Sequence, residues 1–224
     1  WAELSTKFGE LPFSEVLKPA INYAENGYPV SPVTGKFWKL AYKKYKKVLK
    51  GEEFKHWFDT FAPGGRPPRI GEMWSSHDHA ETLKMIAETE AEAFYRGKLA
   101  EIIDSFSRGF GGYLSLEDLK DYRPQWVDPI KVNYRGYDVW EIPPNGQGLV
   151  ALIALNILKG FEFDCKDSVD TYHKQIEAIK LAFADGKKYI TETEDMSTEV
   201  EDLLSESYAA GRRKLIGSKA LKPE

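Results

Sequence analysis

Residues 130–158 read IKVNYRGYDVWEIPPNGQGLVALIALNIL, and this stretch decides the fold. Apolar and polar side chains alternate over residues 130–134 and again over residues 137–141, which is the period of a half-buried strand. The two-residue connection Arg135-Gly136 between them is short enough for a tight turn. We therefore predict a β-hairpin that ends where Pro143 and Pro144 remove backbone donors.

The hairpin leads through Asn145, Gly146, Gln147 and Gly148 into a run from Leu149 to Leu158 that is apolar nearly all round. A helix of this kind is buried on most sides. Glycines at a helix start expose backbone N–H groups where a carboxylate or oxyanion can sit, so these four residues are candidate substrate-binding residues. A tight strand-to-helix turn without a binding role explains the same pattern equally well. Neither interpretation identifies a nucleophile.

Helical spacing dominates the remainder of the chain. We expect a helix over residues 14–24, then a turn-rich link through Pro32 and Gly35, followed by helices from about Lys36 and over 52–61. Residues 62–71 contain too many prolines and glycines for regular structure and form a loop.

A further helix is expected after Asp78, which would cap it together with Glu81, and to continue to Gly97 before resuming up to Gly109. Ser115 and Asp118 repeat the capping signal for a short helix. Asp167 or Ser168 opens a long helix with one apolar face, and a last helix covers residues 200–216. The apolar face of the long helix is formed by Tyr172, Ile176, Ile179 and Phe183.

These elements describe an α+β chain, mostly helical with one hairpin. We predict a mainly helical lobe over residues 1–126, and a second part over 127–224 that contains the hairpin and further helices. At 224 residues with 42% hydrophobic content, the chain can bury one sizeable core and the start of another.

Composition excludes several functions. The net charge of −4 argues against general nucleic-acid binding, because no positive excess is available to neutralise phosphates. The run from Leu149 to Leu158 is about half the length of a membrane span, so no membrane partner is expected. Cys165 is the only cysteine, which excludes an internal disulfide and leaves the cellular compartment open between cytoplasm, periplasm and secretion.

Three polar clusters have ordinary explanations. The run Tyr42-Lys-Lys-Tyr-Lys-Lys47 separates into an apolar and a lysine stripe, which favours a solvated helix face over a nucleic-acid contact. His77-Asp-His79 with Glu81 would need a further ligand from elsewhere to hold a metal, so we predict surface histidines, helix capping and no metal site. Ser75, Ser76, His77 and Asp78 are adjacent in sequence and lack the strand-turn-helix context of a hydrolytic triad.

Taken together, several short segments occur in an order that resembles the gamma-glutamyltranspeptidase family over nearly the whole chain. The segments are Pro19-Ala-Ile, the loop ending at Ile70-Gly71, Ala80-Glu-Thr-Leu83, Ala93-Phe-Tyr-Arg-Gly97, Gly111-Gly112, Glu117-Asp-Leu119, Tyr134-Arg-Gly-Tyr137, Pro143-Pro144, Glu177-Ala178 and Ala182-Phe-Ala-Asp185. The variant Pro143-Pro-Asn-Gly-Gln-Gly148, with Trp140-Glu-Ile before it, is similar to a transferase-like branch of that family.

The resemblance implies an N-terminal-nucleophile hydrolase, with sheets sandwiched between helix layers, made as a precursor that cleaves itself into two subunits. This chain would be the later part of the large subunit, and the hairpin and helices of residues 127–224 would pack on the core of that sandwich. The nucleophile would be the N-terminal threonine of a separate small subunit, so no catalytic residue falls on this chain. The implied activity is cleavage or transfer of a small gamma-glutamyl amide, without a cofactor, in a heterodimer or larger assembly. A non-catalytic helical scaffold and an amidase acting on another acyl group remain the alternatives.

Overall fold

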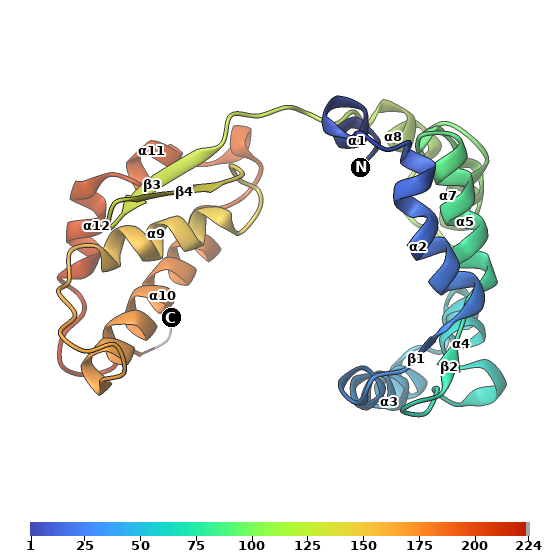
Figure 1. The fold of residues 1–224 in the computed structure, drawn as a ribbon, viewed down its shortest axis with the longest axis horizontal. Helices are drawn as coiled ribbons and strands as arrows, with labels where there is room; N and C mark the ends of the chain where they lie inside the picture. Colours follow the sequence, from blue (N-terminus) through green and yellow to red (C-terminus); the bar gives the residue numbers. More distant parts are fainter. Residues whose placement is uncertain (223–224) are drawn as a thin grey trace. The chain divides into compact units, whose positions relative to one another are not determined.

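A computed structural model describes residues 1–222 and is mostly helical (Figure 1). The chain forms two compact units, the first from Trp1 to Pro124 and the second beginning at Gln125. Within the described residues, no helix is both long and apolar enough to cross a bilayer.

The first unit is helical apart from a short ribbon, in which Tyr28 of β1 lies opposite Trp74 of β2. Its elements are α1 (Ala2–Phe8), α2 (Phe13–Asn26), β1 (Tyr28–Pro29), α3 (Pro32–Val48), α4 (Lys55–Phe61), β2 (Met73–Trp74), α5 (His77–Glu88), α6 (Glu92–Tyr95), α7 (Lys98–Gly109) and α8 (Leu116–Asp121), with short 3-10 turns at Glu52–Phe54 and Pro63–Gly65.

Two small apolar clusters hold this unit together. Phe13 and Leu17 of α2 pack with Ala87 of α5. An aromatic group connects α3, α4 and β2, where the rings of Trp38 and Trp74 lie 5.1 Å apart and Phe61 stacks on Trp74 at 5.9 Å. Such ring pairs add to the stabilisation that comes from burial alone.

The expected link through Pro32 and Gly35 is wrong, because α3 already begins at Pro32. The side chain of Ser31 accepts a hydrogen bond from the N–H of Thr34 and caps the helix. Proline at the first helical position costs nothing there, since its missing N–H would have no partner in the helix.

The expected cap at Asp78 is also wrong. Helix α5 begins at His77 after Ser76, and no side chain caps it. The Ser76 hydroxyl is instead hydrogen-bonded to Nδ1 of His79 at 2.6 Å. The box that the sequence predicts for Ser115 and Asp118 is confirmed at α8.

The helix expected to reach Gly97 is interrupted before α6. The Thr89 hydroxyl donates to the carbonyl of Met85 and accepts the N–H of Ala93, so it competes with the helical backbone pattern. Glu90 and Ala91 then adopt positive φ angles of 50° and 72°. Helical periodicity does not reveal this break, because the apolar stripe continues through it.

The second unit contains the hairpin, confirmed with the register Val132 opposite Val139. Arg135 and Gly136 both have positive φ, as the favoured two-residue hairpin turn requires. The elements are β3 (Ile130–Tyr134), β4 (Tyr137–Glu141), α9 (Gly148–Leu158), α10 (Val169–Tyr189), α11 (Val200–Leu203) and α12 (Glu206–Arg213), with a 3-10 turn at Thr193–Asp195.

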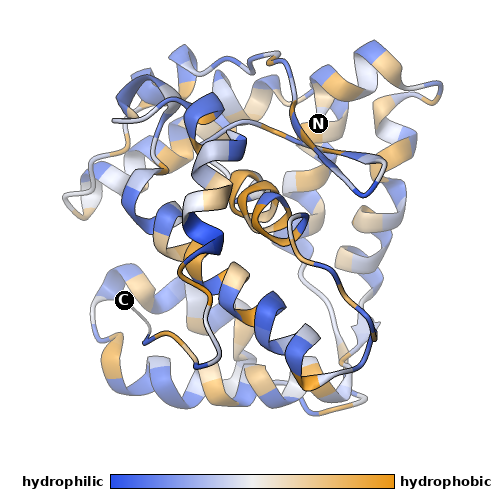
Figure 2. Cartoon of the chain, turned by 90° about the vertical axis from the view of Figure 1, so that its left-hand side faces the viewer, coloured by the Kyte–Doolittle hydropathy of each residue, from blue (hydrophilic) through white to orange (hydrophobic). Residues whose placement is uncertain are grey.

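Helix α9 is the core of this unit, as its sequence predicts. It packs against β3, α10 and α12, and Figure 2 shows it as a hydrophobic helix surrounded by more polar elements. Close packing of α9 and α10 depends on Gly186, since a methyl group there would lie 2.7 Å from Cγ2 of Val150.

Two neighbouring arginines of α12 anchor it to the core helices. Arg213 donates to the carbonyls of Ile157 and Asn156 at the C-terminal end of α9. Arg212 pairs with the buried carboxylate of Asp185 on α10. The expected single helix over residues 200–216 is wrong, because Ser205 starts a new helix by accepting the N–H of Tyr208.

Helix α10 begins after Ser168, which caps it as expected. The apolar face predicted from Tyr172, Ile176, Ile179 and Phe183 is 44–56% exposed. The residues that α10 buries are mainly small or charged, namely Thr171, Glu177, Ala178, Leu181, Ala182 and Asp185.

Replacing Ile157 with alanine should lower the free energy of unfolding by about 2–5 kcal/mol, because the side chain is fully buried on α9 and leaves a cavity. Leu11→Ala is the matched control, since Leu11 is 64% exposed and should change stability by less than about 0.5 kcal/mol. Chemical denaturation of the intact gene product measures both, and equal losses would contradict the assigned core.

Glu177 should contribute to stability in a pH-dependent way. Burial alone would raise the pKa of Glu177, but hydrogen bonds from Lys180 and the N–H of Leu221 hold this pKa below its ordinary value. A lowered pKa gives stability that is complete above the unfolded pKa of about 4.3 and is lost as the pH falls through the folded pKa.

Glu177→Gln should therefore be less stable than wild type at neutral pH, and the difference should shrink as the pH falls below about 4. Thermal denaturation across that range measures the effect. Glu162→Gln changes the net charge equally at an exposed position and serves as the control. A difference for Glu177→Gln that is independent of pH would rule out the carboxylate contact as its cause.

Candidate functional site

The candidate loop lies between β4 and α9. Asn145, Gly146 and Gln147 are exposed, and Gly148 is half-buried as the first residue of α9. Val150 donates its N–H to the carbonyl of Gln147, so the helix starts with a tight turn. Within residues 1–222, no acceptor takes the N–H of Gly148 or Leu149. Leu149 is fully buried, so the N–H of the half-buried Gly148 is the one of these two donors that could meet an oxyanion.

A carboxylate already lies at this helix end. A methyl group built on Gly148 would be 2.7 Å from Oε2 of Glu141 and 2.8 Å from its Cβ, so the Glu141 side chain packs directly against Gly148. A negative charge beside a helix N-terminus stabilises the helix and repels a second anion. The loop therefore suits a polarised carbonyl better than a free carboxylate.

The loop is tied to the segment that follows α10. The Asn145 amide donates to the carboxylate of Glu192, and the Thr193 hydroxyl donates to the carbonyl of Pro144 at 2.9 Å. The Asn145 side chain is thus occupied in holding the loop. The role of Asn145, Gly146, Gln147 and Gly148 in substrate binding stays a prediction.

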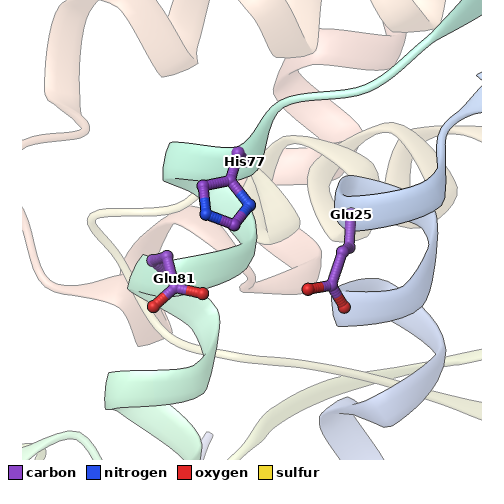
Figure 3. A group of neighbouring side chains, drawn as sticks. All are labelled: Glu25, His77 and Glu81. Carbon is purple, nitrogen blue, oxygen red and sulfur yellow. The ribbon is translucent and has the colours of Figure 1, made fainter.

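The histidine motif does gain a ligand from elsewhere. Glu25 of α2 faces His77 and Glu81 of α5, with their ligand atoms all within 4.8 Å of one another (Figure 3). His77 and Glu81 are one helical turn apart and share a face. Sequence spacing did not reveal Glu25, because it comes from the other helix of the α2–α5 pair.

A cationic side chain of the protein already joins these two carboxylates. Lys84 Nζ lies 2.8 Å from Glu25 and 3.0 Å from Glu81. The hydrogen bond from Lys84, with a smaller contribution from His77, lowers the pKa of Glu25. The hydrogen bonds to Glu25 and Glu81 raise the pKa of Lys84. A divalent cation would have to displace this ammonium group, so the cluster is best described as an exposed ion-pair network.

The serine and histidine residues around the start of α5 do not form a hydrolytic site. Ser76 is buried, and its hydroxyl contacts His79 three residues later. The imidazole of His79 packs against Phe61 and Trp74. The pair therefore fixes the start of α5 and presents no accessible hydroxyl.

A cleft of about 970 Å³ lies in the first unit, and no sequence signal predicted it. It is lined by α1, by the turn around Glu90 and Ala91, and by the stacked rings of Tyr95 and Tyr122. Arg96 in its wall is engaged by Glu92 and by the carbonyl of Tyr122. The hydroxyl of Thr89 is likewise held by the backbone, so this lining residue is not a ready nucleophile.

The family model described as Gamma-glutamyltranspeptidase matches residues 1–224. This chain belongs to the gamma-glutamyltranspeptidase family. It is 34% identical to the glutathione hydrolase-like YwrD proenzyme of Bacillus subtilis, a match that covers all of this chain and 42% of that protein. It is 33% identical to the acylase ACY 1 proenzyme of Pseudomonas sp. strain V22, covering 99% of this chain and 39% of that protein.

Two solved structures place the fold. The cephalosporin acylase from Bacillus halodurans is 62% identical with a TM-score of 0.95, and the match covers all of this chain and 42% of that one. The Helicobacter pylori gamma-glutamyltranspeptidase is 27% identical with a TM-score of 0.83, covering 99% of this chain and 63% of that one. The chain is therefore part of an N-terminal-nucleophile hydrolase fold, and it spans less than half the length of its curated relatives.

Gly148→Ala should lower the free energy of unfolding by about 1–3 kcal/mol, because the added methyl group overlaps the Glu141 side chain. Gly146→Ala is the matched control, since nothing lies within 4 Å of a methyl group there. Denaturation of the two variants measures the contrast. Equal stability of Gly148→Ala and Gly146→Ala would show that Glu141 does not pack on the helix start.

Proposed function

We propose that this chain is the later part of the large subunit of an amide-bond hydrolase or acyl transferase, which acts with a small subunit that begins with a threonine. The family membership and the descriptions of its relatives as proenzymes support this arrangement. Among the described residues, other contacts hold the hydroxyls of Ser76, Thr89 and Thr193 and the carboxylates of Glu25, Glu81 and Glu192.

The proposed chemistry uses the threonine hydroxyl as nucleophile. Its own α-amine, with a pKa near neutrality, takes the hydroxyl proton as the oxygen attacks the amide carbon. The tetrahedral oxyanion is held by backbone donors, and its collapse expels the amine with a proton. The acyl-enzyme then passes to water or to an acceptor amine. In this scheme the N–H of Gly148, which no acceptor among residues 1–222 takes, lines the site near the reacting carbonyl.

The exposed apolar face of α10 is an argument for a second subunit that covers it. Val169 extends the row of Tyr172, Ile176, Ile179 and Phe183, and these side chains are 44–87% exposed. Their spacing of three and four residues forms one continuous apolar stripe along the helix. Soluble proteins rarely leave such a stripe in water, so another part of the enzyme is the expected cover. A heterodimer or larger assembly follows from this proposal.

Two acyl groups are candidates for the substrate. Gamma-glutamyl amides are favoured by the family and by the relative described as glutathione hydrolase-like. Another acyl group, such as the side chain of a beta-lactam, is favoured by the 62% identity to a protein described as a cephalosporin acylase. Both reactions break an amide bond by the same steps, so the difference lies in the residues that hold the acyl group.

Mass analysis of the intact gene product should find two polypeptides, the second beginning with threonine. Replacement of that threonine with alanine should leave one unprocessed chain without activity. Turnover of a gamma-glutamyl anilide, compared with release of the side chain from a cephalosporin, identifies the acyl group. A single chain without turnover of either substrate would favour the alternative of a non-catalytic scaffold.

Ile176→Asp on α10 should reduce the yield of two-subunit enzyme by at least about tenfold, because a buried unpaired charge costs several kcal/mol. Lys188→Asp places the same carboxylate at an exposed position of α10 that lies away from this stripe, and should assemble normally. Size-exclusion chromatography with quantification of both subunits gives the result. If Ile176→Asp assembles normally, α10 is not part of the interface between the subunits.

A further inference from the structure

Helix α3 concentrates positive charge that forms no ion pair with a carboxylate of the described residues. It contains no aspartate or glutamate, and Lys50 follows two residues after its last residue, Val48. All lysines of this helix are exposed, as expected for a solvated face. They are Lys36, Lys39, Lys43, Lys44, Lys46 and Lys47. Among residues 1–222, no carboxylate forms an ion pair with any of them or with Lys50. This is a local cationic surface on a chain whose net charge is −4.

An apolar row shares this exposed surface. Val33, Phe37, Leu40 and Val48 are 53–67% exposed and fall on one side of the helix by their spacing. Trp38 and Tyr45 occupy the other side and contact the aromatic residues of β2 and α4. The outer face of α3 therefore combines large apolar side chains with lysines.

We propose that this outer face of α3 docks on a bilayer surface that is rich in anionic lipid. Lysines on the polar side with phenylalanine and leucine on the apolar side are typical of helices that lie in the headgroup region. Each lysine is attracted by the negative surface potential, and the apolar side chains enter the acyl boundary. Such binding needs no membrane-spanning helix, which is why the length of the apolar runs did not predict it.

The shape of the surface favours a lipid over an acidic peptide. A peptide partner would gain affinity from a groove that takes its side chains. No residue of α3 lines the cleft beside α1 and α6, or the smaller cleft beside Arg66 and Glu72. A single helix face with protruding apolar residues fits a soft, flat surface.

The test is sedimentation of the intact gene product with vesicles of phosphatidylcholine, with or without phosphatidylglycerol. Binding is expected only with phosphatidylglycerol, and should be lost at about 1 M salt, where the screening length is about 3 Å. Replacing Lys36, Lys43 and Lys47 with glutamine should weaken binding about a hundredfold. The matched control replaces the exposed Lys166, Lys187 and Lys214 with glutamine and should bind as wild type does.

A second set of variants tests the apolar row in the same vesicle experiment. Phe37→Ser with Leu40→Ser should weaken vesicle binding at least about tenfold while leaving the charge unchanged. Failure of the intact protein to bind phosphatidylglycerol vesicles would overturn the proposal, and would indicate that the face is solvated or covered. Equal binding to soluble polyglutamate, unaffected by the two serine substitutions, would also overturn it in favour of a general polyanion surface.

Discussion

The burial of α9 is the constraint on which the second unit depends. A helix with apolar side chains on nearly every side cannot face water, so the hairpin, α10 and α12 must surround it. The polar atoms of α9 therefore need hydrogen-bond partners from the elements that surround the helix. The amide of Asn156 donates to the carbonyl of Leu204 at 2.7 Å, and Arg213 takes the carbonyls at the C-terminal end. The backbone carbonyls at the C-terminal end of α9 thus fix the position of α12.

Sequence periodicity and capping signals predicted the hairpin, the buried helix and the starts of α8 and α10, because these follow from local spacing. It could not predict which side of an amphipathic helix meets another element. On α10, the large apolar residues such as Ile176 face outward while Ala178 and Ala182 face the core. Small residues let α9 and α10 approach closely. Close packing against α9 therefore decides which face of α10 is buried, even though the other face has the larger apolar side chains.

At the candidate sites, even more of the deciding contacts come from tertiary packing that the sequence pattern does not reveal. The glycines after β4 indicated a helix start with accessible N–H groups. In the structure the residues before α9 are exposed, but Gly148 is half-buried and Leu149 is buried. The contacts that decide its chemistry come from Glu141 on the strand and from Glu192, 47 residues beyond Asn145. Likewise, Lys84 and Glu25 meet only because α2 packs on α5. Pairings of this kind depend on tertiary packing, so a motif read along the chain names the residue types but not their partners.

The helix start at Gly148 also limits how the proposed enzyme can use this chain. A gamma-glutamyl group carries its own carboxylate, and the Glu141 carboxylate beside Gly148 would repel it. A neutral carbonyl is not repelled and would gain from a hydrogen bond with the N–H of Gly148. If the loop lines the site, it therefore faces the bond that breaks, and the acyl group is recognised by other residues. One scaffold can then serve relatives that are described as hydrolases of glutathione and as acylases.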